Sequence, residues 1–399
     1  MKKILFYERQ YTYFESINDT NLRPIHQIFF FLVIVFISCQ SPKTEIIGLE
    51  TVSLTYAKGF EVKKGEGFWI LEVNQPWTGA DKSYRYLILN EEVEKPEVEV
   101  DAVVKLPVDR VILTSTTQIP HLDLLGDSEK LIGFPNFDLI SSQKVWGQIE
   151  SGKMTDLGSG PSANLEMMID LQPDWVMIST LGEDLRQLDL LGQSGVPALI
   201  NGEYVEQHPL GRAEWIKFTG ILLGKYEEAV GVFEEIEKAY QEAESLIKNQ
   251  PNLEKPEVLS GVLYEDVWYV PGADSWGAKI LQNAGGDYVF SDQDGSGSIQ
   301  LSYEYVLNRA MDAPIWIGSA DYESVEQMGD AEPRYRSFQA FQNGSIYTYT
   351  KKKGPKGGLE YFELGYVRPD LVLKDLIKIL HPQLLSDYDL YFYRQLDEN

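Results

Sequence analysis

The chain is poor in the residue types that build metal and redox centres. Its 399 residues include one cysteine, Cys39, and four histidines, His26, His121, His208 and His381. A single cysteine excludes an internal disulfide framework and an all-cysteine metal site. The histidines lack metalloprotease spacing, and neither a G-x-S-x-G nor a Walker-type loop occurs. We therefore expect no catalytic residue, no resident metal or cofactor, and no enzyme activity.

Positive charge is also scarce. The chain has 35 Lys and Arg against 61 Asp and Glu, which gives a formal net charge of −26. Such a protein repels phosphate backbones, so we expect no nucleic-acid partner. The length favours two lobes, because one compact domain holds about 100 to 200 residues.

No apolar run reaches the roughly 20 residues that span a bilayer as a helix. Residues 28–37 read IFFFLVIVFI, follow a basic segment, and precede Ser38 and Cys39. This order resembles a bacterial lipoprotein signal with cleavage before Cys39. It predicts lipid attachment at Cys39 and a location in the periplasm or cell envelope, anchored to the outer face of a bacterial membrane. A plain signal peptide or an uncleaved anchor is the alternative.

Hydrophobic periodicity divides the rest of the chain. Alternation at 51–56, 68–73 and 83–89 predicts short antiparallel strands in a small β appendage. From 111 to 200, short apolar runs alternate with helical patterns, which indicates a parallel sheet covered by helices. The same alternation resumes after 250, with strands expected at 258–263 and 315–317 among others.

Between these halves, apolar residues recur at three- and four-residue steps and predict a helix over 226–249. This helix is expected to bridge two lobes; a packing helix within one lobe is the alternative. The predicted fold class is α/β, with two Rossmann-like lobes joined by a single long rigid helix and a small N-terminal β appendage. The expected boundaries are 1–38 for the signal peptide, 39–100 for the linker and appendage, 101–208 for the N-terminal lobe, 209–250 for the helical linker, and 251–399 for the C-terminal lobe.

A series of short motifs resembles the periplasmic substrate-binding proteins of iron-siderophore and cobalamin ABC importers. In chain order they are Arg110-Val-Ile-Leu-Thr-Ser115, Leu131-Ile-Gly133, Asp156-Leu-Gly158 with Asn164-Leu-Glu166, Leu171-Gln-Pro-Asp174, Gly195-Val-Pro197, Thr219-Gly-Ile-Leu-Leu-Gly-Lys225, Ala284-Gly-Gly286 and Leu301-Ser-Tyr-Glu304. The resemblance covers roughly residues 105–380. It implies two lobes around a ligand cleft, and it implies that Glu166 and Glu304 dock into arginine-lined pockets of the permease. A carboxylate that only favours its helix dipole is the alternative.

Ligands in open α/β sheets bind beyond the carboxyl ends of the strands, which selects the expected ligand-binding residues. In the first lobe they are Thr116, Thr117, Ser159, Thr180 and Tyr204. In the second lobe they are Tyr264, Trp276, Tyr322, Arg334, Arg336, Lys351 and Tyr361. The basic residues suit the oxygens of an iron chelate; a solvated Lys-Gly-Pro loop is the alternative for Lys351.

The expected ligand is a ferric siderophore-like chelate. Cobalamin binders of the family tend to have tryptophan before the Asn-Leu-Glu motif, where this chain has Gly158-Ser159-Gly160-Pro161. Cobalamin or another corrinoid and haem remain alternatives, as do an exported two-lobed enzyme and a surface scaffold lipoprotein. The expected partners are the small-molecule ligand, the importer permease and the membrane through the N-terminal lipid, with the protein a monomer.

Overall fold

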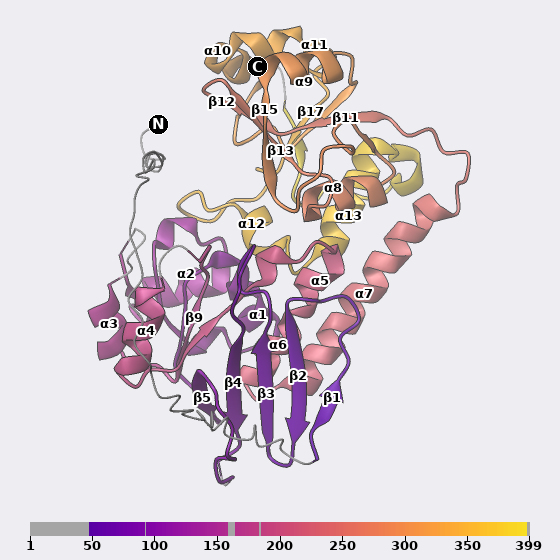
Figure 1. The fold of residues 1–399 in the computed structure, drawn as a ribbon. Coiled ribbons are helices and arrows are strands. Elements are labelled where there is room, and N and C mark those ends of the chain that lie inside the picture. The colour runs from indigo at the N-terminus through magenta and orange to yellow at the C-terminus, as the bar shows by residue number, and fades with distance from the viewer. Residues whose placement is uncertain (1–47, 92, 159–163, 183–184, 397–399) are drawn as a thin grey trace, which may run out of the picture. The chain divides into compact units, whose positions relative to one another are not determined.

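A computed structural model describes residues 48–91, 93–158, 164–182 and 185–396. Residues 45–399 form one compact unit, shown in Figure 1. Cys39, the predicted signal peptide and Ser159 lie outside the described residues. Within the described ranges, no helix combines the length and the apolar character needed to cross a membrane.

The first element is a five-stranded sheet in which β5 pairs parallel with β4 and the other neighbours are antiparallel. Its strands, in spatial order, are β1 (Glu50–Val52), β2 (Phe60–Gly65), β3 (Phe68–Val73), β4 (Tyr84–Leu89) and β5 (Ala102–Lys105). Phe60 and Val62 are buried while Glu61 between them is exposed, so one face is apolar. On this face Phe60 packs against Trp215 and Phe218, with ring centroids 4.5 and 5.5 Å away. The sheet therefore shares its core with the helices that follow the first lobe.

The first lobe is a five-stranded parallel sheet in the order β10-β9-β6-β7-β8. The strands are β6 (Val111–Leu113), β7 (Leu131–Phe134), β8 (Thr155–Asp156), β9 (Trp175–Ile178) and β10 (Ala198–Ile200). Between and after them lie η1 (Thr116–Gln118), α1 (Ile119–Leu124), η2 (Ser128–Lys130), η3 (Phe137–Leu139), α2 (Gln143–Glu150), α3 (Leu165–Asp170), α4 (Arg186–Gln193) and η4 (Glu203–Val205). The chain changes direction across the sheet between β6 and β9, which makes this point a topological switch.

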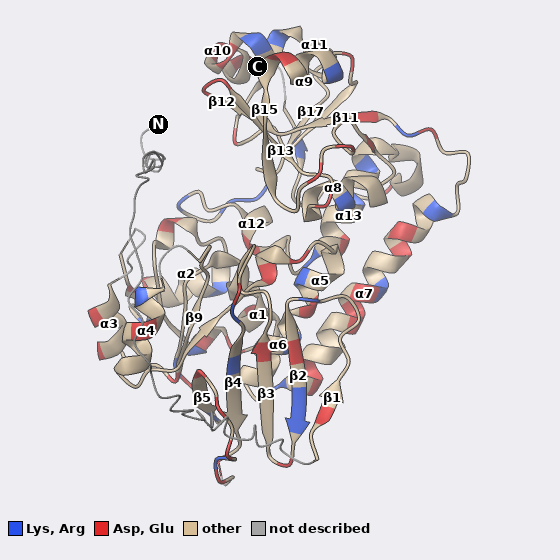
Figure 2. Ribbon diagram, viewed as in Figure 1, with Lys and Arg blue, Asp and Glu red and all other residues tan. Residues whose placement is uncertain are grey.

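Three helices lead to the second lobe: α5 (Pro209–Glu214), α6 (Ile216–Leu222) and α7 (Tyr226–Lys248). The 23 residues of α7 correspond to about 35 Å at 1.5 Å per residue. Its buried residues are Ala229, Phe233, Ile236, Tyr240 and Ala243. They form one stripe that packs on α6 and on α13 (Pro369–Leu380). Acidic residues recur along the remaining faces of α7 (Figure 2).

The second lobe holds a mixed sheet and a smaller antiparallel sheet. The mixed sheet has the order β14 (Asp287–Tyr288), β11 (Glu257–Ser260), β16 (Ile315–Ile317), β17 (Ile346–Thr348) and β18 (Arg394–Gln395), of which β18 is antiparallel. The smaller sheet consists of β12 (Val262–Tyr264), β13 (Val267–Pro271) and β15 (Ser298–Ser302). The helices are α8 (Trp276–Asn283), α9 (Tyr303–Ala310), α10 (Val325–Ala331), η5 (Pro333–Ser337), α11 (Gln339–Gln342), α12 (Glu360–Leu364), α13 and η6 (Pro382–Leu385). The mixed sheet changes direction between β11 and β16, which gives the second lobe its own switch point.

The predicted α/β class with parallel sheets is confirmed. The single strand expected over 258–263 is wrong, because the chain bends at Gly261 and passes from one sheet to the other. Gly261 has a φ of +90°, and a Cβ at this position would lie 2.0 Å from the carbonyl oxygen of Tyr269. Only glycine fits this approach without strain.

Candidate ligand-binding site

A cavity of about 440 Å³ opens at the switch point of the second-lobe sheet. Ser260 and Gly261, at the carboxyl end of β11, line it together with Ile317 and Gly318 at the end of β16. Two residues that precede the second lobe in the chain also line it: Tyr204 in η4 and Arg212 in α5. The position and size are those of a small-molecule site in an open α/β sheet. We call this cavity the aromatic pocket.

Aromatic rings make up much of its wall. They are Tyr204, Tyr269, Trp276, Tyr349, Tyr361, Phe362, Tyr366 and Tyr393. Tyr349 and Tyr361 are stacked, with centroids 4.9 Å apart and planes 14° from parallel. Phe362 meets Tyr349 edge-on at 4.9 Å and is 39% exposed. These rings offer rigid, amphipathic contact area to a large ligand.

Arg212 brings positive charge to the pocket. Its guanidinium carbon lies 4.5 Å from the ring centroid of Tyr366, and Nη2 donates to the carbonyl oxygen of Tyr204 at 2.6 Å. No carboxylate among the described residues forms a salt bridge with it, and no acidic residue lines the pocket. Two buried donors there, Nε of Arg212 and Nε1 of Trp276, have no hydrogen-bond partner in the described part of the chain. The pocket therefore favours a ligand with anionic or acceptor oxygens.

Burial keeps the phenols of the pocket protonated. It raises the pKa of Tyr349 to about 12, and it raises the pKa of Tyr361 well above the usual value. The hydroxyls of Tyr361 and Tyr393 lie 3.4 Å apart. At neutral pH these groups are neutral and can donate hydrogen bonds to ligand oxygens.

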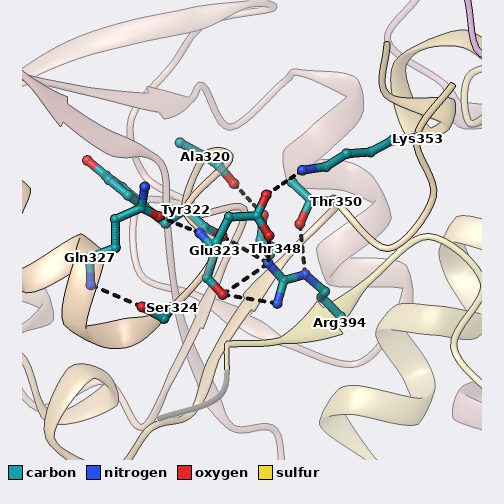
Figure 3. Close-up of polar contacts among 9 residues, drawn as sticks. All are labelled: Ala320, Tyr322, Glu323, Ser324, Gln327, Thr348, Thr350, Lys353 and Arg394. Atoms are coloured by element: carbon teal, nitrogen blue, oxygen red, sulfur yellow. Dashed lines mark hydrogen bonds and ion pairs between the residues drawn. The ribbon is translucent and has the colours of Figure 1, made fainter. Parts of the chain in front are cut away.

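A polar network fixes the loops beyond β16 and β17 (Figure 3). Glu323 accepts from Arg394 at 2.9 Å and from Lys353. Arg394 also donates to the hydroxyl of Thr350 at 3.0 Å and to the carbonyl of Tyr322 at 3.2 Å. The C-terminal strand β18 thus ties together two loops at the carboxyl edge of the sheet.

The segment after this network contacts the first lobe. On α12, Glu363 accepts from the backbone N–H of Ser141 at 2.6 Å and of Ser142 at 2.8 Å. A Cβ at Gly354 would lie 2.2 Å from the carbonyl of Ile140, so the backbones approach closely. Burial, opposed by these hydrogen bonds, raises the pKa of Glu363 to about 7. One titratable carboxyl therefore lies between the lobes.

Three of the residues predicted to bind ligand line the aromatic pocket: Tyr204, Trp276 and Tyr361. Thr116 and Thr117 lie in η1, and Thr180 follows β9, at the carboxyl edge of the first-lobe sheet. None of these three threonines lines the aromatic pocket. Ser159 falls among the residues that are not described.

The remaining predicted residues of the second lobe also lie outside the pocket lining. Tyr264, at the end of β12, is 48% exposed, and the Tyr322 carbonyl belongs to the Arg394 network. Arg334 pairs with Glu332 and Asp266, Arg336 with Asp330, and the ammonium of Lys351 donates to the carbonyl of Leu390. These cations are engaged within the protein.

The two predicted docking glutamates have the same local setting, one in each lobe. Glu166 is the second residue of α3, after the N-cap Asn164, and Glu304 is the second residue of α9, after the N-cap Ser302. Each N-cap side chain accepts from the backbone N–H three residues on. Both glutamates are exposed, and neither has a hydrogen bond or ion pair to another described residue.

Sequence reasoning missed several lining residues, above all Arg212, Tyr349, Tyr366 and Tyr393. Arg212 lies on a helix among buried residues such as Leu210 and Ala213. A single cation in such an apolar segment was the signal that could have identified it. Among the described residues no group of three His, Cys, Asp or Glu side chains could hold a metal ion.

Comparison with known proteins gives a family match that covers more than half of the chain. A model described as periplasmic binding protein matches residues 111–353. An uncharacterized lipoprotein of Methanocaldococcus jannaschii is 28% identical over 300 residues, which cover 73% of this chain and 69% of the relative.

Two solved structures share the fold. A periplasmic heme-binding protein from Pseudomonas aeruginosa has a TM-score of 0.56 at 16% identity, covering 73% of this chain and 99% of that one. Helicobacter pylori Ceue, solved with Ni(II) bound, has a TM-score of 0.54 at 17% identity, covering 72% and 88%. Both alignments leave about a quarter of the chain without a counterpart.

Proposed function

The chain belongs to the periplasmic binding protein family, and we propose that it is the substrate-binding lipoprotein of an ABC importer that captures a ferric siderophore-like chelate. Members of this family bind solutes for transport and are not enzymes. The aromatic pocket is the proposed capture site, and the importer permease is the proposed partner.

The observation that carries this proposal is the composition of the pocket wall. The wall combines the stacked rings of Tyr349 and Tyr361 with the guanidinium of Arg212, and no carboxylate lines the cavity. Catecholate and similar chelates present flat rings together with anionic oxygens, so they match both features. A bare metal ion matches neither, since the described residues hold no cluster of metal-ligating side chains.

Haem is the second candidate. A planar macrocycle with carboxylate arms also suits the stacked pair Tyr349 and Tyr361 and the charge of Arg212. The heme-binding protein of Pseudomonas aeruginosa supports this alternative through its shared fold. The binding experiment below separates the two ligands.

The proposed delivery step uses the surfaces of both lobes. Glu166 and Glu304 dock on the permease, because exposed carboxylates without internal partners can pair with arginines and fix the register of a transient complex. Cys39 carries the lipid after removal of residues 1–38, and the lipoprotein name of one relative supports this assignment. The tether holds the ligand near the permease and raises its effective concentration.

The test is a titration of residues 40–399, which lack the signal peptide and the lipid-bearing Cys39, with ferric catecholate and hydroxamate chelates, haem and cobalamin. Tryptophan fluorescence follows the binding. We expect saturable quenching by a ferric chelate without turnover. Arg212→Gln should weaken that binding by about 30- to 150-fold, because truncating one partner of a buried charge pair costs about 2 to 3 kcal/mol. Arg85→Gln removes a guanidinium from the N-terminal sheet and serves as the matched control.

The thermal midpoint of each variant shows whether it is folded. If no ferric chelate quenches the fluorescence of the wild type, the proposed ligand is refuted. Saturable binding of haem alone would select the second candidate instead.

A further inference from the structure

A second chamber, of about 690 Å³, adjoins the aromatic pocket. Its walls come from residues 55–58 and 75–80, which are loops of the N-terminal sheet, and from residues 205–208. Lys279 and Ser296 of the second lobe complete it, and Ser296 lines both cavities. The family match covers residues 111–353, so the two loops lie outside the shared scaffold.

Close packing holds the loop between β3 and β4 against the carboxyl edge of the first-lobe sheet. A Cβ at Gly202 would lie 2.5 Å from the carbonyl oxygen of Gln75. Gly182 has a φ of +89°, and a Cβ there would lie 2.6 Å from the ring of Trp77. Glycines at the ends of two strands therefore make room for the loop. The wall is built into the fold.

Tyr204 connects the chamber to the aromatic pocket. Tyr204 lines the aromatic pocket, and Val205, which follows it directly in the chain, lines the chamber, so the two linings are in contact. Together with Ser296, this contact makes the two cavities neighbours along one continuous wall. A ligand too large for the aromatic pocket would extend into the chamber.

The chamber offers cations that have no carboxylate partner. Lys58 is exposed, and its ammonium forms no salt bridge with a described residue. The ammonium of Lys279 donates to the neutral side chain of Gln207 at 3.2 Å. Two such cations in a chain of net charge −26 form a local site for an anion.

The nearby acidic side chains are already engaged. Glu206 lines the chamber, but its Oε1 accepts from the backbone N–H of Lys58 at 2.8 Å and of Gly59 at 2.7 Å, and from the indole of Trp215 at 3.1 Å. The carboxylate of Glu214 accepts from the ammonium of Lys217 at 2.8 Å. Only neutral donors hold the Glu206 carboxylate, which keeps its negative charge, so two lysines face one carboxylate in the lining of the chamber.

Three aromatic side chains add a flat, partly apolar surface. His208 stacks on Tyr56 with centroids 4.7 Å apart, and the half-buried Trp77 lies beside them in the lining. We propose that the N-terminal sheet supplies a second ligand subsite, which receives an anionic arm of the chelate whose core occupies the aromatic pocket. This inference rests on the proposed function and adds a ligand class: chelates with a carboxylate-bearing arm.

The test compares two synthetic iron(III) tricatecholate chelates that differ only by a pendant carboxylate arm. The wild type should bind the armed chelate about three- to tenfold more tightly, and added salt should reduce this preference, because exposed charges are screened. Lys58→Gln with Lys279→Gln should remove the preference and leave the affinity for the armless chelate unchanged. Lys105→Gln with Lys153→Gln changes the net charge equally, away from the chamber, and should keep the preference.

Equal affinity of the wild type for both chelates would overturn the second subsite while the proposed function stands. Equal losses for both chelates in the Lys58 and Lys279 variant would overturn it as well. Failure of the wild type to bind either chelate would overturn the proposed ligand and the subsite together. A preference that is lost only in the chamber variant supports the subsite.

Discussion

In the first lobe, the loops after β6 and β9 present the small polar residues Thr116, Thr117 and Thr180, whereas the loops after β11, β16 and β17 of the second lobe border an aromatic pocket. Both sheets have a switch point, so the backbone topology offers a ligand site in each lobe. The difference lies in the side chains. In our proposal, this difference gives the second lobe the main contacts with the ligand.

The first lobe differs in a second way, because a loop of the N-terminal sheet packs on its carboxyl edge. The two lobes are alike, however, in their exposed helix starts, with Glu166 on one and Glu304 on the other. The lobes thus divide ligand contact unequally and, in our proposal, share docking equally. Each part of this comparison can be tested separately.

The largest effect is expected at the docking glutamates. Glu166→Arg with Glu304→Arg should lower uptake of a labelled ferric chelate more than 100-fold in proteoliposomes that contain the permease, because charge reversal replaces two ion pairs by repulsion. Each single variant should lower the uptake about tenfold if the two lobes contribute equally to docking. The affinity for the chelate should stay at the wild-type value.

Glu234→Arg with Glu235→Arg, on the exposed side of α7, makes the same charge change elsewhere and should leave uptake intact. Loss of chelate affinity in the Glu166 and Glu304 double variant would argue for a ligand-binding role instead. Unequal single variants would show that one lobe dominates docking.

An intermediate effect is expected when a side chain at the aromatic pocket of the second lobe is compared with one in the loops beyond the first-lobe sheet. Phe362→Ala should weaken chelate binding about tenfold, since loss of one stacking ring costs about 1 to 2 kcal/mol. Leu181→Ala, in the loop after β9 and 69% exposed, should change it less than twofold. Titration by tryptophan fluorescence measures both, and a larger loss in the Leu181 variant would reverse the comparison.

The sequence predicted the strongly periodic elements closely. The long helix expected over 226–249 begins at the first residue of α7 and ends one residue beyond its last. The break at Gly261 could not be predicted, because it depends on a distant contact with the Tyr269 carbonyl. The strands β2 and β5 were also not predicted, because the apolar alternation in β2 stops after Val62 and β5 has only four residues.

The candidate site was predictable only in part. Tyr204, Trp276 and Tyr361 lie in the pocket, but Arg212 and Tyr366 come from segments that do not follow a strand. The rule that ligands lie beyond strand ends cannot select such residues. The predicted contributions of Thr116, Thr117, Ser159, Thr180 and the cations stay predictions.

The smallest effect is expected where the lobes meet, at Glu363. Burial raises the pKa of this carboxyl from 4.5 to about 7. Between these values the folded protein holds a proton that the unfolded chain releases, so the carboxyl contributes less stability as the pH rises through this window. Glu363→Gln lacks the titration. The thermal unfolding midpoint of the wild type, minus that of the Glu363→Gln variant, gives a difference that should therefore fall from pH 5 to pH 7. This difference should stay constant above about pH 7.5.

Thermal unfolding at pH 5, 6, 7 and 8 measures this difference. Glu360→Gln serves as the control. It removes a carboxylate of the same helix, which accepts from the Tyr391 hydroxyl and from no other group in the described part of the chain. Because Glu363 joins α12 to the backbone before α2, acid should strengthen the contact between the lobes. A difference that rises with pH would mean that the hydrogen bonds from Ser141 and Ser142 outweigh desolvation and hold the carboxyl ionised.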